Sequence, residues 1–203
     1  MSTRRALGIG IAAACAIAAL GAAAPMSGPI RLSAFAVNMS NIRTARSTAV
    51  IDIRVDRWSG DEERQRLINT FLNNGQDALL HALQKVPSKG RIRIPGWQGP
   101  DPHNYRLGWD LRYAWEFAGE DGGRRIVIAT DRYIGFLEAR ESPRSIDYPF
   151  TFIEIRLNAD GEGEGKLAAA TKLTFNKKKN VVELENYSSE PIRLQSVRVE
   201  KSK

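Results

Sequence analysis

Histidine and cysteine, which most often bind transition metals or act as bases and nucleophiles, are scarce in this chain. There are two histidines, His81 and His103, and one cysteine, Cys15. Asp101 and His103 are spaced so that both could ligate one ion, but a zinc site needs three or four protein ligands. We therefore predict no metal site and no cofactor, and we interpret His103 as a polar residue in a proline-rich loop.

Covalent and acid–base catalysis are also weakly indicated. A nucleophilic serine needs a base and an orienting acid, and the chain has no Gly-x-Ser-x-Gly segment that would present such a serine on a sharp turn. A glycosidase needs only two carboxylates across a cleft, but acids also occur normally on the solvent face of strands. The patterns favour a protein that is not an enzyme, with a carboxylate-dependent, glycosidase-like envelope hydrolase as the alternative. The acids available for that chemistry are Asp110, Glu116, Asp131, Asp147 and Glu154.

Two short segments resemble ligand-binding loops in composition but are better explained as turns. Residues 158–164 combine acids and glycines without the twelve-residue pattern of a calcium loop. Lys177-Lys178-Lys179 precedes Asn180 and is typical of a solvated hairpin tip. The formal net charge of +7 is not gathered into a basic stripe, so we expect no nucleic-acid partner.

Aromatic and arginine side chains concentrate between residues 97 and 117. The aromatic residues in the turn-rich loop 95–105 could form an exposed stacking surface. The aromatic residues that alternate along the following segment form either core or the lining of a cavity. The arginines could bind an acidic group, although pairing with Asp110 and Glu116 across strands is the interpretation we favour. The predicted ligand-binding residues are Trp97, His103, Tyr105, Arg106, Trp109, Arg112 and Tyr113, and the expected ligand is small and apolar or sugar-like.

Alternation of apolar residues predicts that strands position these side chains. Period-two patterns occur at 51–55, 107–117, 150–157 and 167–175, with Trp109, Tyr113, Trp115 and Phe117 on one face. Asp121-Gly122-Gly123 and Asp160-Gly161 predict hairpin turns.

A change of parity at Gln195-Ser196 predicts a β-bulge in the last strand, Ile192 to Val199, which we expect at an edge of the sheet. We expect an α+β, mainly antiparallel fold in which about eight strands form a curved sheet, a sandwich or a barrel.

One segment, at about 60–86, has helical period instead. Ser59-Gly60-Asp61-Glu62 resembles a capping box, Asn73-Asn74-Gly75 interrupts the pattern, and Pro87 ends it. These signals predict a helical hairpin inserted early and covering one face or mouth of the sheet. Its apolar side carries Leu67, Ile68, Phe71, Leu72, Leu79, Leu83 and Val86.

The first residues have the pattern of a secretory signal peptide. Arg4-Arg5 precedes an apolar run from Ala6 to Leu20, and small residues follow before Pro25. The run is shorter than the roughly 20 residues that a membrane-spanning helix needs, so a retained anchor is only the alternative. We predict a signal peptide at 1–23, a flexible lead-in at 24–31 and one domain at 32–203. The two arginines fit both the general and the twin-arginine export routes.

Removal of this segment takes away Cys15 and lowers the formal net charge from +7 to +5. The mature chain then has no disulfide and no integral membrane span, and we expect it in the periplasm or secreted.

Several segments together resemble uncharacterised exported bacterial proteins that have no established activity: Leu107 to Tyr113, Gly123 to Arg132, Ile146 to Thr151 and Leu184 to Tyr187. The resemblance extends over most of residues 33–198. It implies export and a shared fold, and it assigns no site residues.

Composition, patterns and resemblance together predict an exported, non-enzymatic binding or interaction module of the bacterial envelope. Its partner would be a small ligand or an envelope protein. A structural component that recognises another protein through a sheet edge is a further alternative.

Overall fold

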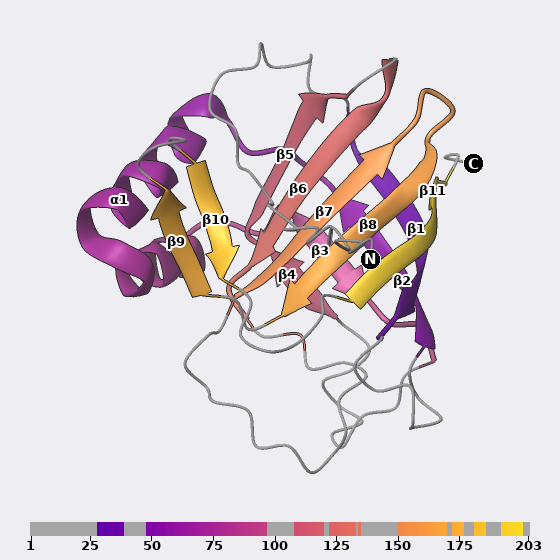
Figure 1. Cartoon of the computed structure of the whole chain (residues 1–203), viewed down its shortest axis with the longest axis horizontal. Coiled ribbons are helices and arrows are strands. Elements are labelled where there is room, and N and C mark those ends of the chain that lie inside the picture. The colour runs from indigo at the N-terminus through magenta and orange to yellow at the C-terminus, as the bar shows by residue number, and fades with distance from the viewer. Residues whose placement is uncertain are drawn as a thin grey trace, which may run out of the picture.

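The computed structural model describes residues 28–38, 48–96, 108–119, 122–132, 134, 150–169, 172–176, 181–185 and 192–200 (Figure 1). They form one helix and eleven strands. The predicted signal peptide and most of the lead-in lie outside these residues. The elements are β1 (Ile30–Val37), β2 (Thr48–Val55), α1 (Asp61–Gln84), β3 (Gly90–Arg93), β4 (Trp109–Leu111), β5 (Tyr113–Ala118), β6 (Arg124–Thr130), β7 (Thr151–Leu157), β8 (Glu162–Ala169), β9 (Lys172–Asn176), β10 (Val181–Glu185) and β11 (Ile192–Val199).

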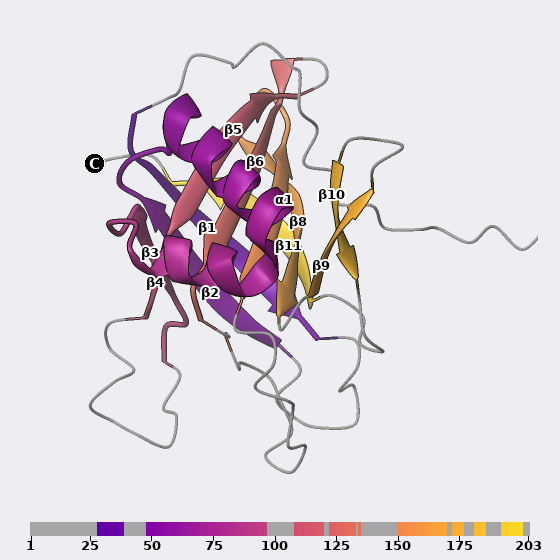
Figure 2. The same ribbon diagram turned by 90° about the vertical axis from the view of Figure 1, so that its left-hand side faces the viewer.

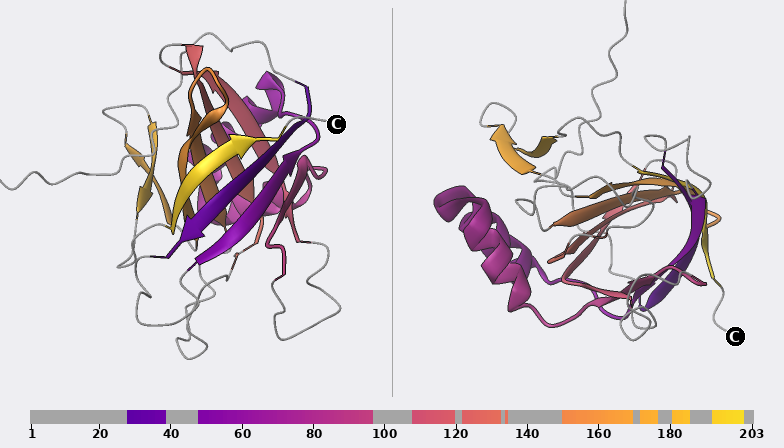
Figure 3. Two further views of the ribbon diagram at one scale, coloured as in Figure 1. Left: turned by 90° about the vertical axis from the view of Figure 1, so that its right-hand side faces the viewer. Right: turned by 90° about the horizontal axis from the view of Figure 1, so that it is seen from below.

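Nine of the strands form one antiparallel sheet in the order β4-β3-β2-β1-β11-β8-β7-β6-β5. The sheet curves into a nearly closed barrel, as the view from below shows (Figure 3). Its two outermost strands, β4 and β5, follow each other directly in the chain. They are separated only by Arg112, whose amide donates to the Ala129 carbonyl on β6 at 2.9 Å. The predicted mainly antiparallel, curved sheet is confirmed, and its form is barrel-like.

The interior of the barrel is filled with aliphatic side chains that alternate along the strands. Ile51, Ile53 and Val55 on β2 are at most 1% exposed, as are Ile126 and Ile128 on β6. Burial of this kind contributes about 25 cal/mol for each Å² of apolar surface removed from water. The barrel core therefore holds the scaffold together, and the described residues place α1 outside it.

Helix α1 covers the outer face of β5 and β6 (Figure 2). It contributes to a second apolar cluster with Tyr113, Trp115, Val127 and Phe150. In the middle of α1, Gly75 has φ +80° and ψ −169°, which are not helical values, so the helix kinks there. The predicted hairpin of two helices is not confirmed; α1 is one element with a first arm (61–74) and a second arm (76–84) on either side of Gly75.

The start of α1 also differs from the prediction. Gly60 is the N-cap residue and no side chain caps the helix. Ser59 is buried, and its hydroxyl accepts a hydrogen bond from the Ala114 amide of β5 at 3.4 Å. The predicted capping box is therefore wrong, because Ser59 is engaged by the sheet and not by the helix.

Two predictions about strands are corrected by the topology. The predicted strand at 167–175 is divided between β8 and β9, and β9 pairs with β10 in a separate two-stranded sheet. Strand β11 lies between β1 and β8 and not at an edge. The predicted bulge in β11 is confirmed, since the register shifts between Leu194 and Val197 and Ser196 has φ +50°.

The aromatic side chains predicted on one face are divided between two. Trp109 packs against the barrel interior, whereas Tyr113, Trp115 and Phe117 lie in the cluster under α1. The bend at Arg112 causes this, because it reverses which side of the sheet the alternate residues occupy. Leu111 before the bend and Ala114 after it both face the interior.

Candidate functional site

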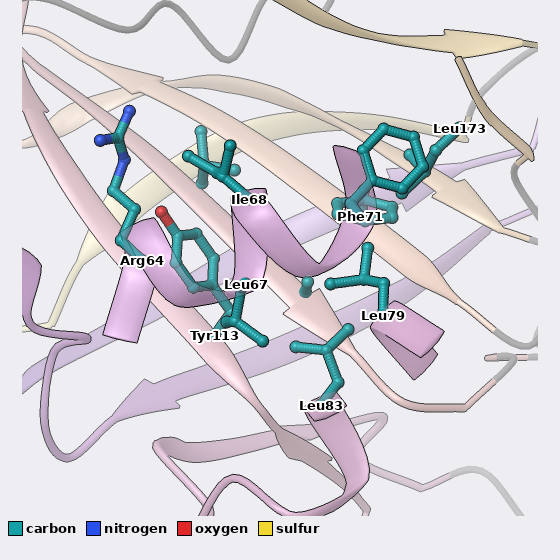
Figure 4. A pocket seen from close by; sticks show the side chains of 11 residues that line it. Arg64, Leu67, Ile68, Phe71, Leu79, Leu83, Tyr113 and Leu173 are labelled. Atoms are coloured by element: carbon teal, nitrogen blue, oxygen red, sulfur yellow. The ribbon is translucent and has the colours of Figure 1, made fainter. Parts of the chain in front are cut away.

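An apolar cavity lies between α1 and the outer face of the sheet (Figure 4). Its volume is about 60 Å³, roughly that of two water molecules in the liquid. The cavity is enclosed by four parts of the chain: helix α1 with both of its arms, the strand pair β5–β6, strand β7 and strand β9. The lining residues are Arg64, Leu67, Ile68, Phe71, Leu79, Leu83, Tyr113, Val127, Ala129, Phe152 and Leu173.

The kink at Gly75 brings both arms of α1 to this cavity. Leu67 and Phe71 lie four residues apart on the first arm, and Leu79 and Leu83 do so on the second, so each pair forms one apolar face. A straight helix of this length would extend about 1.5 Å per residue and carry its end far from its start. The break lets both apolar faces cover the same strands.

Both ends of α1 are attached to one short stretch of the sheet. The Ser59 amide donates to the Ala114 carbonyl at 2.8 Å, just before the helix begins. After the helix ends, the Arg112 guanidinium donates to the Val86 carbonyl at 3.0 Å, and the Lys89 amide donates to the Leu111 carbonyl at 2.7 Å. The bend between β4 and β5 therefore fixes the position of the whole helix.

A buried ion pair adds to this attachment. The Lys89 ammonium lies 2.9 Å from the Glu63 carboxylate, and their side chains are 8% and 19% exposed. The pair joins the first turn of α1 to the segment that follows the helix. The other carboxylate oxygen of Glu63 is buried without a hydrogen-bond partner, so Lys89 is the group that offsets its charge.

One end of the cavity is polar. The guanidinium carbon of Arg64 lies 5.2 Å from the centre of the Trp115 ring, a distance typical of cation–π contact. The Tyr113 hydroxyl lies at the same end of the cavity as Arg64 (Figure 4). Arg64 Nε is buried and has no hydrogen-bond partner.

The protonation of Tyr113 follows from the same surroundings. Burial raises the pKa of the Tyr113 phenol well above its ordinary value near 10, while the Arg64 guanidinium acts in the opposite direction. The nearby acids Glu63 and Asp61 add to the increase in the pKa. The phenol therefore keeps its proton at neutral pH and remains a hydrogen-bond donor.

Strand β9 closes the cavity near the kink of α1 (Figure 4). Leu173 is buried at the lining, and its amide donates to Oε1 of Gln76 at 2.9 Å. Gln76 directly follows the kink residue Gly75. The contact couples the two-stranded sheet to the point where α1 bends.

Comparisons with models of protein families, with curated proteins and with solved structures find no match. The site must therefore be interpreted from its own geometry. No helix in the described part of the chain combines the length and the apolar character needed to cross a membrane.

The structure does not gather the predicted ligand-binding residues into one site. Tyr113 lines the cavity, Arg112 positions α1, and Trp109 packs against the barrel interior on the other side of the sheet. The other four predicted residues lie outside the described part of the chain: Trp97, His103, Tyr105 and Arg106.

The carboxylates considered for catalysis are engaged by arginines within the scaffold. Arg112 lies 3.2 Å from Asp131 and 3.7 Å from Asp110. Arg124 pairs with Glu116 at 3.5 Å across β5 and β6, as the favoured cross-strand interpretation predicts, and Arg125 pairs with Glu154 at 2.8 Å. Asp147 lies outside the described residues. Among those that are described, no acid lines the cavity and no group of three or more His, Cys, Asp or Glu could hold a metal ion.

The sequence patterns identified the apolar residues of the site and Tyr113 but missed Arg64 at its polar end. Leu67, Ile68 and Phe71 were predicted to face a common surface. Arg64 lies three residues before Leu67, on the same side of the first arm. An arginine that continues an apolar helical stripe is the signal that could have identified it.

Proposed function

We propose that this chain is a non-enzymatic binding module of the bacterial envelope that takes an apolar ligand group into the cavity under α1. The observation that supports this best is the lining, which is apolar apart from Arg64 and the Tyr113 hydroxyl at one end. Apolar cavities in proteins stay dry and bind small apolar molecules. The signal-peptide pattern of the first residues supports export, so the proposed module would work outside the cytoplasm.

The volume limits what enters. A space of about 60 Å³ accepts only part of an alkyl chain, so a six-carbon tail enters fully only if the arms of α1 or strand β9 move apart. The packing of the barrel interior supports the same location, since large aliphatic side chains fill it. Ligand binding therefore belongs to the outer face of the sheet.

The test is a titration with a neutral apolar probe, 1-hexanol, followed by NMR of side-chain methyl groups. We expect saturable shifts at Leu67, Leu79 and Leu83, which lie around the cavity. Ala129→Val adds two methyl groups to the lining on β6 and should weaken binding severalfold, because it fills the space.

Ala49→Val is the matched control, since Ala49 packs at the barrel interior away from the cavity. It should bind 1-hexanol as the parent protein does. Shifts that are absent in the parent, or that persist unchanged in Ala129→Val, would contradict the proposal.

A further inference from the structure

Building on the proposed function, we infer that the ligand is an apolar chain that ends in an oxyanion, held by Arg64 and Tyr113. The chain would enter between the arms of α1, and the oxyanion would remain at the polar end of the cavity. A carboxylate and a phosphate monoester share this chemistry.

Arg64 is a cation that the fold leaves without an acid. Among the described residues no carboxylate pairs with it, whereas other cations of the sheet and of the segment after the helix, such as Lys89 and Arg112, do pair with acids. Its Nε is buried without a partner, and an unsatisfied charged donor of this kind is costly to bury. An oxyanion at this position would supply the missing acceptor, and a guanidinium suits carboxylate and phosphate because it donates two parallel hydrogen bonds.

Trp115 holds the guanidinium in place. The ring of Trp115, 3% exposed, lies against one side of it, which limits its rotamers. The Tyr113 hydroxyl lies at the same end of the cavity (Figure 4), and its proton can be donated to a second oxygen of the ligand. Two donors then converge at the edge of an apolar space.

The acids near this end leave room for an anion. Glu63 lies in the first turn of α1 and is mostly buried. The Lys89 ammonium, 2.9 Å away, offsets its charge. Asp61 and Glu62 are exposed in the first turn of α1, where water screens them. Arg64 is therefore the cation at the cavity end that is left to pair with an anion.

The experiment compares three probes with the same tail: 1-hexanol, hexanoate and hexyl phosphate, each titrated by NMR. We expect at least one of the two anions to bind about tenfold or more tightly than the alcohol, because hydrogen bonds to charged groups are the stronger ones. Preference for hexanoate or for hexyl phosphate then distinguishes the two head groups.

Arg64→Gln should remove this advantage, so that in the variant neither anion binds more tightly than 1-hexanol does. Tyr113→Phe, which removes only the hydroxyl, should weaken anion binding severalfold and provides the test if Arg64→Gln does not fold. Arg66→Gln, at an exposed position of the same arm, is the control and should change neither affinity.

The outcomes separate the two proposals. If no probe binds, the proposed function itself fails. If 1-hexanol binds as tightly as both anions, or if Arg64→Gln retains the preference for an anion, the cavity is a binding site but the oxyanion inference is wrong.

Discussion

Replacing Gly75 with alanine tests whether the kink in α1 depends on a conformation that only glycine adopts easily. Gly75 has φ +80° and ψ −169°, a region that is essentially restricted to glycine. A Cβ atom built there would meet nothing within 4 Å. Steric contact with neighbours therefore contributes nothing, and the whole effect of Gly75→Ala comes from the backbone.

The expected loss is about 1–3 kcal/mol of unfolding free energy, the usual strain of such a backbone conformation. Gly60→Ala is the matched control on the same element. Gly60 has φ −82° and ψ 163°, and its Cβ would also lie in open space. Alanine adopts these values without strain, so the gain from a stiffer unfolded chain and the loss of a favourable N-cap residue should nearly cancel.

Urea unfolding of both variants measures these differences, and circular dichroism at 222 nm reports the helix content. If the native kink strains alanine, the unfolding free energy of Gly75→Ala falls below that of the parent. Binding of 1-hexanol should also weaken, because the arms of α1 no longer close on the cavity. Equal stability of Gly75→Ala and the parent protein would refute the reasoning, because it would mean that α1 does not need the kink in solution.

Three further predictions concern the same region. Lys89→Met should lower the unfolding free energy by about 3–5 kcal/mol, because it leaves the buried Glu63 carboxylate without its cation. In urea unfolding, the double variant with Glu63→Leu should recover most of this loss. A double variant as unstable as Lys89→Met would contradict the assigned role of the pair. Because the pKa of Tyr113 is raised, the folded protein keeps a proton that the unfolded chain loses above about pH 10. The unfolding free energy should therefore decline above that pH more steeply in the parent than in Tyr113→Phe. Parallel profiles of unfolding free energy against pH would contradict this prediction. Leu83→Ala, at a side chain 2% exposed, should cost about 2–5 kcal/mol and, by enlarging the cavity, should strengthen binding of 1-octanol relative to 1-hexanol; an unchanged ratio would show that Leu83 does not limit the space.

Local sequence patterns predicted the strands and turns well where neighbours in the sequence decide the structure. The turn before β8 is an example, since Gly161 has φ +81° and the Glu162 amide donates to the Asn158 side chain at 2.9 Å. The bulge in β11 is another, because a change of parity is visible in the residues themselves.

Long-range arrangement was not readable in the same way. The alternation from Trp109 to Phe117 suggested a single face, but the bend at Arg112 depends on pairing with two different strands, β3 and β6. Ser59 looked like a helix cap, yet its partner is Ala114, far away in the sequence. Such pairings are set by the whole sheet and leave no periodic signal.

About half of the candidate site could be predicted from the sequence. The apolar residues of α1 recur at helical spacing, which predicts an apolar helix face that packs against another part of the fold. The role of Arg64 depends on its having no ion-pair partner among the described residues and on the ring of Trp115 beside it, and both are properties of the folded protein.

The position of β11 has a consequence for the order in which the chain can fold during its synthesis. Strands β1 to β4 and β5 to β8 form two groups of neighbours, and β11 is the strand that joins β1 to β8. Of the described strands, it is the last to be synthesised. Until Ile192 to Val199 emerge, β1 and β8 lack the strand that pairs with both, so a growing chain cannot complete the barrel. The pairing order of the sheet therefore makes closure of the barrel depend on β11, the strand that joins its two halves.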